Sequence, residues 1–329
     1  MCGSGVGEIR HLTDFQRSLS LDRIYVKGKI PVPVPQSGFD RGNIRILSWN
    51  IEHGRNPAQI AETIAVAEPD IACLQEVDWG NERTGSVDVL EIVARHTGMQ
   101  GLYTVEFLEV PSPLRPSHFK GGGATGNAVL TRLQSMSAFR IDLPISVDWH
   151  PQADRSEMPS SVRRRIRKEP RIGRRCALGA EFRVGAGNLL VCSMHLEDKF
   201  GGVRGRWLQY SAAVRAVEIR RGSTGIGVAA GDFNTLDSPL ARLLYPDSDA
   251  TALGKPWHMT EASWWKSGLL PGTAYSDPFL PSDWTFRLSP FFRAKLDWIT
   301  TRGAQVHQCG VGPLSGPDHR PIWVDLATG

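Results

Sequence analysis

The chain has 329 residues, of which 41% are hydrophobic and 22% are charged, and its formal net charge is +4. This composition is typical of a soluble globular protein, and no stretch approaches the ~18 apolar residues that a membrane-spanning helix needs. The N-terminus lacks the charged-then-apolar pattern of a secretory signal. The five cysteines are widely spaced and form no C-x-x-C pair, which argues against a disulfide framework or a structural zinc site. We therefore expect a cytoplasmic protein.

Residues 1–42 carry little hydrophobic pattern and include Pro31-Val32-Pro33-Val34-Pro35, a helix-incompatible stretch. We interpret them as an N-terminal appendage and residues 43–329 as one domain. Within that domain, apolar runs and helical spacing predict strands over 44–50, 71–76, 126–131, 177–184, 189–195, 227–231, 296–300 and 322–325, and helices over 57–67, 87–97 and 205–220.

The order strand–helix–strand occurs early, over residues 44–76, and again over 189–231. In each half the strands are apolar enough to be covered, and helical segments lie between them. Two such halves, packed sheet on sheet with helices outside, predict a four-layer α/β sandwich.

Two segments stand out by composition. Residues 257–292 are rich in aromatic side chains interrupted by Pro and Gly, which is typical of a long loop region with some packed anchors. Residues 163–175 are strongly basic, which is expected either of a loop that faces a polyanion or of a solvated, partly disordered loop. The positive residues of this run, opposed only by Glu169, are Arg163, Arg164, Arg165, Arg167, Lys168, Arg171, Arg174 and Arg175.

The apolar run that begins at Val228 ends at Gly231 and is followed by Asp232 and Asn234. In an extended chain, residues two positions apart point to the same face, so these two side chains would lie together. A carboxylate can take a proton from water, and an amide NH₂ can hold an anionic oxygen. Both residues are also common in turns, so this stretch alone does not decide between the two interpretations.

Polar residues follow most of the other predicted strands as well. Each has an ordinary structural explanation, such as a strand end, an ion pair or a hydrogen-bonded histidine. An acid inside an apolar strand, such as Asp297, is costly unless it is paired. The recurrence at strand ends favours a shared site made of Asn50, Glu76, His195, Asp232, Asn234, Asp297, Asp318 and His319.

The order of these motifs resembles the endonuclease/exonuclease/phosphatase family, over about residues 43–326. The resemblance rests on Trp49-Asn50, Pro69-Asp70-Ile71 with Leu74-Gln75-Glu76, Gly126-Asn127-Ala128-Val129-Leu130, His195-Leu196, Gly231-Asp232-Phe233-Asn234, Leu296-Asp297-Trp298-Ile299 and Ser315-Gly316-Pro317-Asp318-His319. It implies a DNase I-like fold, with two packed, mainly antiparallel sheets flanked by helices. It also implies metal-dependent cleavage of phosphoesters, with residues 43–329 as the catalytic domain.

The resemblance further implies that Glu76, Asn50 and Asp318 form the metal site. The expected ion is Mg²⁺, which prefers oxygen ligands, and Mn²⁺ can substitute. Glu52 stands two positions after Asn50, where abasic-site endonucleases carry Asp, and whether Glu52 reaches the metal stays open.

For catalysis, the resemblance implies that Asp232 activates the attacking water and that Asn234 and His195 hold the phosphoryl oxygens. Asp297 and His319 would form a carboxylate–imidazole pair beside the developing charge. Whether His319 also donates a proton to the leaving group stays open. His195 stands where the abasic-site endonucleases have Tyr, which makes this chain more similar to the members that have His there, and Lys295 stands where many relatives have Arg.

The expected substrate contacts are Arg83, Asn127, Arg163, Arg164 and Arg165. The leading interpretation is a nuclease acting on DNA or RNA, because phosphate neutralisation by Lys and Arg dominates nucleic-acid affinity. The alternatives are a phosphatase or sphingomyelinase-like phosphodiesterase acting on a small phosphoester or an anionic lipid, and a relative that binds without catalysis. No stable protein partner is implied, and we expect a monomer.

Overall fold

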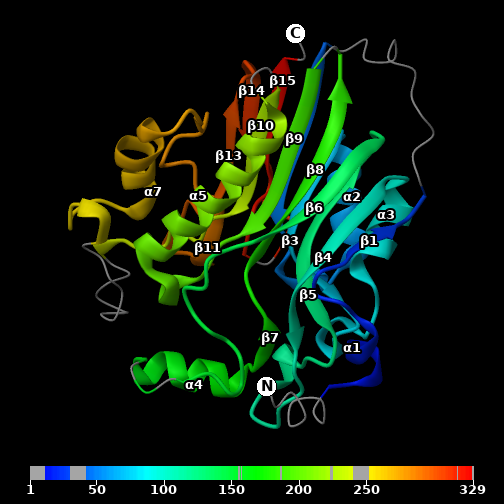
Figure 1. Cartoon of the computed structure of the whole chain (residues 1–329), viewed down its shortest axis with the longest axis vertical. Helices are drawn as coiled ribbons and strands as arrows, with labels where there is room; N and C mark the ends of the chain where they lie inside the picture. Colours follow the sequence, from blue (N-terminus) through cyan, green and yellow to red (C-terminus); the bar gives the residue numbers. More distant parts are fainter. Residues whose placement is uncertain are drawn as a thin grey trace, which may run out of the picture.

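The computed structural model describes residues 12–29, 42–154, 156, 158–185, 187–222, 225–239, 252–316 and 318–327. The stretch 31–35 and Cys2 lie outside the described residues. Two main sheets form the centre of the molecule (Figure 1). In spatial order, the first sheet contains β1 (Ile24–Lys27), β4 (Gln100–Glu109), β5 (Ala124–Thr131), β3 (Ile71–Trp79), β2 (Asn43–Asn50), β15 (Ile322–Ala327) and β14 (Val306–Val311), with β7 (Arg171–Gly173) paired to β4.

The second sheet has the order β13 (Asp297–Arg302), β10 (Ile226–Asp232), β9 (Gly187–His195), β8 (Cys176–Val184) and β6 (Ser135–Asp142). A separate hairpin consists of β11 (Phe286–Ser289) and β12 (Phe292–Ala294). Most neighbouring strands are antiparallel, and the parallel pairs are β2 with β3 and β9 with β10. The mainly antiparallel arrangement implied by the resemblance is therefore confirmed.

Helices cover the outer faces of both sheets (Figure 1). The α-helices are α1 (Asp14–Ser18), α2 (Pro57–Ala67), α3 (Val89–Thr97), α4 (Ser160–Lys168), α5 (Gly202–Arg221) and α7 (Glu261–Trp264). Short helical segments are η3 (Glu52–Gly54), η4 (Glu82–Thr84), η5 (Ser117–Phe119), η6 (Lys199–Gly201), η7 (Ala252–Gly254), η8 (Trp265–Leu269) and η9 (Leu270–Gly272).

Alternating side chains of the strands build three apolar layers. Ile46 of β2 packs between the two sheets, together with Val191 and Val228 from the second sheet. Its neighbour Leu47 points to the opposite face, into the layer under α2 and α3. The outer face of the second sheet packs against α5 and the segment around Trp265. The predicted four-layer α/β sandwich is confirmed.

The predicted strands and helices all form, with small changes at their ends. The strands that were not predicted are β1, β4, β6, β7, β11, β12 and β14. In β4 the polar residues Thr104, Glu106 and Glu109 interrupt the apolar pattern, although all three are buried. The carboxylates are buried because arginines pair with them: Arg175 pairs with Glu106, and both Arg115 and Arg171 pair with Glu109. β6 and β14 are the outermost strands of their sheets, and their side chains are largely exposed.

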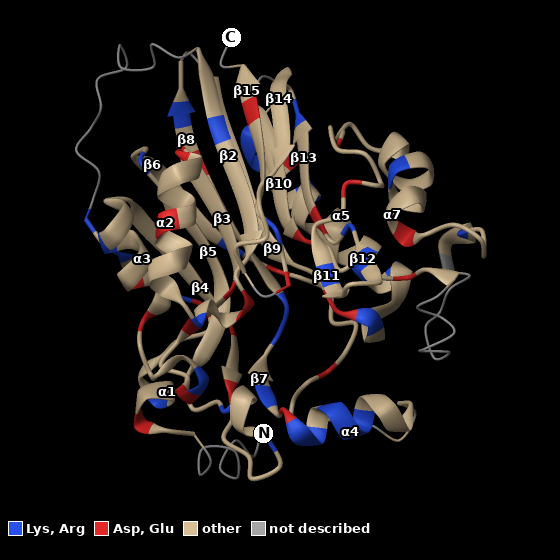
Figure 2. Cartoon of the chain, turned by 180° about the vertical axis from the view of Figure 1, so that it is seen from behind, with Lys and Arg blue, Asp and Glu red and all other residues tan. Residues whose placement is uncertain are grey.

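The first part of the basic run is a helix, so the loop expected there is wrong. Val162 and Ile166 of α4 are buried against Trp149 and Phe107, because residues four apart lie on one face of a helix. The arginines between them obscured this apolar pair. In Figure 2, α4 is a blue helix at one end of the molecule.

Residues 12–29 lie on the first sheet. β1 pairs with β4, and α1 begins with a capping box between Thr13 and Gln16. The buried amide of Gln16 donates hydrogen bonds to the carbonyl oxygens of Glu109 and Gly123. This contact ties the start of the chain to β4 and to the loop before β5. In the described part of the chain, no helix is long and apolar enough to cross a membrane.

Candidate active site

Three site residues predicted from the sequence lie side by side at one end of the second sheet. Asp232, the last residue of β10, is paired with His195 of β9 and with Asp297 of β13. Nε2 of His195 is 3.6 Å from Oδ2 of Asp232. All three residues are buried, so the strand register brings them together in a place with little water.

His319 lies between β14 and β15 of the first sheet and completes this group. Its Nδ1 is 2.8 Å from Oδ2 of Asp297, and its Nε2 is 3.8 Å from Oδ2 of Asp232. Trp49 donates a hydrogen bond to the backbone carbonyl of His319. Burial alone would lower the pKa of His319, but the facing Asp297 and Asp232 raise it well above its usual value. The imidazolium form is thereby favoured.

Asp232 itself has a raised pKa, about 7. Burial is the main cause, and the charge of Asp297 adds to it, whereas His319 acts in the opposite direction. His195 behaves differently, because burial and the nearby Arg175 lower its pKa well below the usual value. The pKa values of the two histidines are therefore shifted in opposite directions.

The first sheet contributes Asn50 and Glu76. Asn50 ends β2, and its Nδ2 donates to Oε1 of Glu76 and to Oδ2 of Asp232, at 3.2 and 3.0 Å. Asn50 thus joins the two sheets at the site. Glu76 lies where the register between β3 and β5 shifts, and its φ is +54°. This bulge, which re-aims a side chain, turns Glu76 out of the strand's alternation.

Carboxylate oxygens converge around Glu76. Oε2 of Glu52 and Oδ1 of Asp318 are buried and have no hydrogen-bond partner among the described residues. Burial raises the pKa of both carboxyls, and the charge of Glu76 adds to it. The charge of Asp318 also raises the pKa of Glu52. Such unpaired oxygens fit a hard divalent cation. Within the described residues, however, no group of three His, Cys, Asp or Glu side chains is preassembled around one metal position.

Asn234 reaches the site in a different way from the one expected. β10 ends at Asp232, and Asn234 has a left-handed φ of +52°. Its backbone N–H donates to Oδ1 of Asp232, and its side-chain amide donates to the carbonyl of Leu196. The prediction that strand alternation places Asn234 beside Asp232 is therefore wrong. An Asx turn positions Asn234 instead.

His53 is a site residue that the sequence reasoning missed. Its Nε2 is 3.4 Å from Oε2 of Glu76, and its Nδ1 is 3.5 Å from Oδ1 of Asp78. Arg83 donates two hydrogen bonds to Asp78, at 2.7 and 2.8 Å, and its side chain is only 1% exposed. Arg83 was expected at the substrate, and the structure places it behind His53 instead. The signal in the sequence that could have identified it is a histidine only three residues after Asn50, a predicted site residue.

The other expected substrate contacts lie in three different surroundings. Asn127 is fully buried, and its amide donates to the carbonyl of Cys176. Arg163 and Arg164 are exposed on α4. Arg165 forms an ion pair with Glu169 and lines the same cavity as Glu76 and Asp318.

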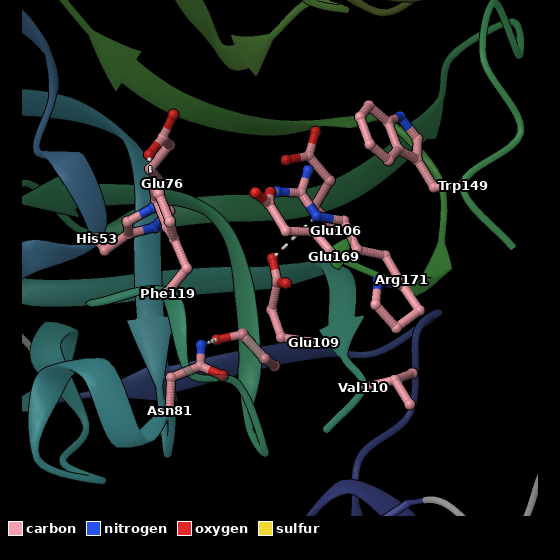
Figure 3. Close-up of polar contacts among 12 residues, drawn as sticks. His53, Glu76, Asn81, Glu106, Glu109, Val110, Phe119, Trp149, Glu169 and Arg171 are labelled. Atoms are coloured by element: carbon pink, nitrogen blue, oxygen red, sulfur yellow. Dashed lines mark hydrogen bonds and ion pairs between the residues drawn. The ribbon is translucent and has the colours of Figure 1, made fainter. Parts of the chain in front are cut away.

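That cavity has a volume of about 240 Å³ and extends from the carboxylates of the site to a group of buried charges. Figure 3 shows His53 and Glu76 at one end, Arg171 and Trp149 at the other, and Glu106 and Glu109 between them. Glu76, His195, Asn234 and Asp318 line the first end. The residues that the sequence predicts to be catalytic therefore lie together, and two of them, His195 and Asn234, line this cavity.

A model of the Endonuclease/Exonuclease/phosphatase family matches residues 47–324. The chain belongs to this family. Members of the Endonuclease/Exonuclease/phosphatase family are generally phosphoester hydrolases and typically depend on a divalent metal. A comparison with curated protein sequences gave no significant match.

Solved structures of the family share the fold at low sequence identity. The endonuclease/exonuclease/phosphatase from Beutenbergia cavernae DSM 12333 is 18% identical, with a TM-score of 0.59, over 87% of this chain and 72% of that chain. A protein of the same description from Bacteroides vulgatus is 16% identical, with a TM-score of 0.55, over 86% and 98%. The human Nocturnin catalytic domain, solved with a bound sulfate anion, is 17% identical, with a TM-score of 0.54, over 86% and 93%. At these identities, the likeness establishes the fold alone.

Proposed function

We propose that the chain is a Mg²⁺-dependent phosphodiesterase that cleaves nucleic acid by in-line attack of a water on phosphorus. The observation that carries this proposal is the convergence of Asp232 with the His319–Asp297 pair, opposite Glu76 across the Asn50 hydrogen bonds. A base, a cationic imidazole and carboxylate oxygens on facing sides of one site are the groups that hydrolysis of a phosphodiester requires.

Asp232 is the group that orients and deprotonates the water. Asn50 and the backbone N–H of Asn234 each donate to one of its carboxylate oxygens, which fixes the direction of its remaining lone pairs. The second N–H of the Asn234 amide and Nε2 of His195 serve as contacts for the non-bridging phosphoryl oxygens.

His319 stabilises the charge that develops on the phosphoryl group. Asp297 holds the imidazole ring at Nδ1, so that Nε2 is the atom presented to the substrate. Because the raised pKa keeps this ring protonated, it provides positive charge in a buried site where electrostatic interactions are strong.

Glu76, Asn50 and Asp318 would hold the Mg²⁺, with Glu52 as a further oxygen ligand, and Mn²⁺ can substitute. Bound there, the ion neutralises phosphoryl charge as a Lewis acid. The unpartnered oxygens of Glu52 and Asp318 support this assignment.

The exposed arginines of α4 favour nucleic acid as the substrate. Arg163 and Arg164 are exposed, and Arg165 on the same helix lines the cavity that contains the site. A row of arginines beside the site can neutralise successive phosphates of a strand.

A substrate panel with Mg²⁺ or EDTA tests the proposal, with single- and double-stranded DNA, RNA, sphingomyelin and inositol phosphates as its arms. We expect hydrolysis of a nucleic acid that stops in EDTA. Asp232→Asn should reduce kcat about 10²- to 10⁴-fold, the usual contribution of a positioned base, and His319→Ala is the inactive control. Full activity of Asp232→Asn would show that another group activates the water.

A phospholipid substrate is the second candidate, and one observation favours it. The β11–β12 hairpin pairs with His319 through Phe286, and two apolar side chains project from it, Leu288 at 64% exposure and Phe291 at 96%. An exposed apolar tip beside the site can enter a membrane surface. Release of a soluble headgroup from sphingomyelin, with no turnover of DNA or RNA, would replace the first proposal by this one.

A further inference from the structure

The cavity at the site continues beyond the catalytic residues into a recess lined by Glu106, Glu109, Phe119, Thr125, Trp149 and Arg171 (Figure 3). None of these residues has a role in the mechanism above. A phosphoester bound between Glu76 and Asp318 would direct one of its two substituents into this recess, because both ends belong to the same cavity.

Buried polar atoms without hydrogen bonds gather around this cavity. Among the described residues, 15 buried side-chain polar atoms have no hydrogen-bond partner, and eight of them belong to residues that line it. Four of the eight lie in ion pairs, on His53, Glu109, Arg171 and His195, and the other four are on Glu52, Glu106, Thr125 and Asp318. In the recess they include Oε1 of Glu106 and Oγ1 of Thr125, on side chains that are 1% and 5% exposed. Buried polar groups are almost always hydrogen-bonded, so the recess is built to face a polar occupant.

The recess offers both donors and acceptors. Oε2 of Glu106 accepts a hydrogen bond from Arg175, which leaves Oε1 of this lining residue without a hydrogen bond. The hydroxyl of Thr125 can donate or accept, and Nδ1 of His195 has no hydrogen-bond partner among the described residues, although Oε2 of Glu106 lies 3.9 Å away. Water fills a polar cavity of this size in the free protein, and a ligand that reproduces the hydrogen bonds of that water can displace it.

On its far side the recess ends against buried parts of β4 and α4. Glu106 and Glu109 on β4 are fully buried, and α4 packs Val162 and Ile166 onto Trp149 and Phe107. The volume of about 240 Å³ is below the roughly 300–1,000 Å³ of pockets that enclose a drug-sized ligand. Because this volume also includes the end of the cavity at Glu76 and Asp318, the recess itself has room for one ring-sized group and too little for a strand to continue through it.

We propose that this recess is a specificity subsite for one terminal, hydrogen-bonding ring next to the scissile phosphate, so that the enzyme removes end nucleosides and does not cut within a strand. The inference rests on the proposed function, since it takes the phosphodiesterase site as given. The same ring chemistry occurs at a strand end and in a free nucleotide ester, and the experiment below distinguishes these two sources.

The first experiment compares a linear oligonucleotide, the covalently closed circle of the same sequence, and a mononucleotide ester, each with Mg²⁺. We expect stepwise trimming of the linear strand and at least about 100-fold slower cleavage of the circle. Turnover of the mononucleotide ester alone would assign the recess to free nucleotides. Equal rates on circle and linear strand would overturn the subsite and leave the phosphodiesterase intact, whereas inertness on all three substrates would overturn both.

The second experiment removes the Thr125 hydroxyl while keeping the shape of the side chain. Thr125→Val should raise KM for the linear strand about three- to tenfold, the usual effect of one lost hydrogen bond, with kcat nearly unchanged. A strand whose terminal residue lacks its base should show no such increase in KM. Phe119→Ala, in the wall of the same recess, should raise KM in the same direction.

Thr131→Val is the matched control, because Thr131 is buried in the same strand and its hydroxyl donates to the carbonyl of Leu133. It should lower Tm without changing KM. If Thr125→Val and Phe119→Ala both leave KM for the linear strand unchanged, the recess is not a substrate subsite.

Discussion

Single side chains determine how the predicted metal ligand Glu76 is held. His53 lies between Glu76 and Asp78, and Arg83 anchors Asp78 from behind. Burial opposes ionisation of Glu76, but His53, His195 and the Asn50 hydrogen bond outweigh it and lower the pKa of Glu76. The backbone adds strain at the same place, since Glu52, His53 and Glu76 all have positive φ, which is costly for residues other than glycine.

His53→Gln tests this arrangement through metal binding. Residues that orient a ligand typically contribute 10- to 100-fold in metal affinity, so we expect Mn²⁺ binding, measured by titration calorimetry, to weaken within about that range. His96→Gln, on the exposed side of α3, should bind as wild type does. Unchanged affinity in His53→Gln would contradict a positioning role for His53.

Helix α4 has two different faces: one carries the buried pair Val162 and Ile166, and the other carries exposed arginines. Its Arg165 is tied to Glu169, and Arg171 just after it is tied to Glu109 and Glu169. The charge of the run is thus partly neutralised within the protein. Arg163 and Arg164 remain exposed, and we propose that they carry the interaction with a polyanion.

The double variant Arg163→Gln/Arg164→Gln should weaken binding of single-stranded nucleic acid several-fold near 0.1 M salt. The slope of log affinity against log salt should fall by about 0.7 for each phosphate contact that is lost. Fluorescence anisotropy over a salt series, in EDTA to prevent cleavage, measures both. The control Arg95→Gln/Arg183→Gln removes equal charge from exposed sites elsewhere, and an equal effect there would indicate that only net charge matters.

Across the whole molecule, a buried ionic chain connects the two sheets. Glu106 of β4 in the first sheet pairs with Arg175, which precedes β8 of the second sheet and also pairs with Glu197. Burial raises the pKa of Glu106 to about 7, although Arg175 opposes the shift. The folded state therefore keeps a proton on Glu106 that the unfolded chain releases near its usual pKa of about 4.3.

This linkage makes stability depend on pH in a defined direction. For a carboxyl whose pKa is raised in the folded state, the contribution to stability is full below the unfolded pKa and is lost as pH rises through the folded pKa. Glu106→Gln should abolish this loss, so its free energy of unfolding relative to wild type should increase by roughly 2–4 kcal/mol from pH 4.5 to pH 8. Urea denaturation at both pH values measures the difference. Glu62→Gln, exposed on α2, should parallel wild type, and a parallel profile for Glu106→Gln would refute the assignment.

The sequence predicted some strands of the fold and missed others. β2 and β10 were predicted because their buried residues are apolar and local in sequence. β4 was missed because its buried Glu106 and Glu109 look like surface residues until their arginines are known. Arg83 was expected at the substrate because an arginine looks like a surface residue in the sequence. In the structure, Asp78, five residues away, binds it inside the protein.

By itself, the sequence determined the layers, the order of the motifs along the chain and the set of polar residues at strand ends, since hydrophobic periodicity and motif order are properties of neighbouring residues. Only the tertiary structure decided which charges line the candidate site and which face each other. That choice depends on pairs far apart in the chain, such as Glu106 with Arg175 and Asp297 with His319. A buried charge is tolerated only where such a partner arrives, and its arrival depends on the folding of the whole chain.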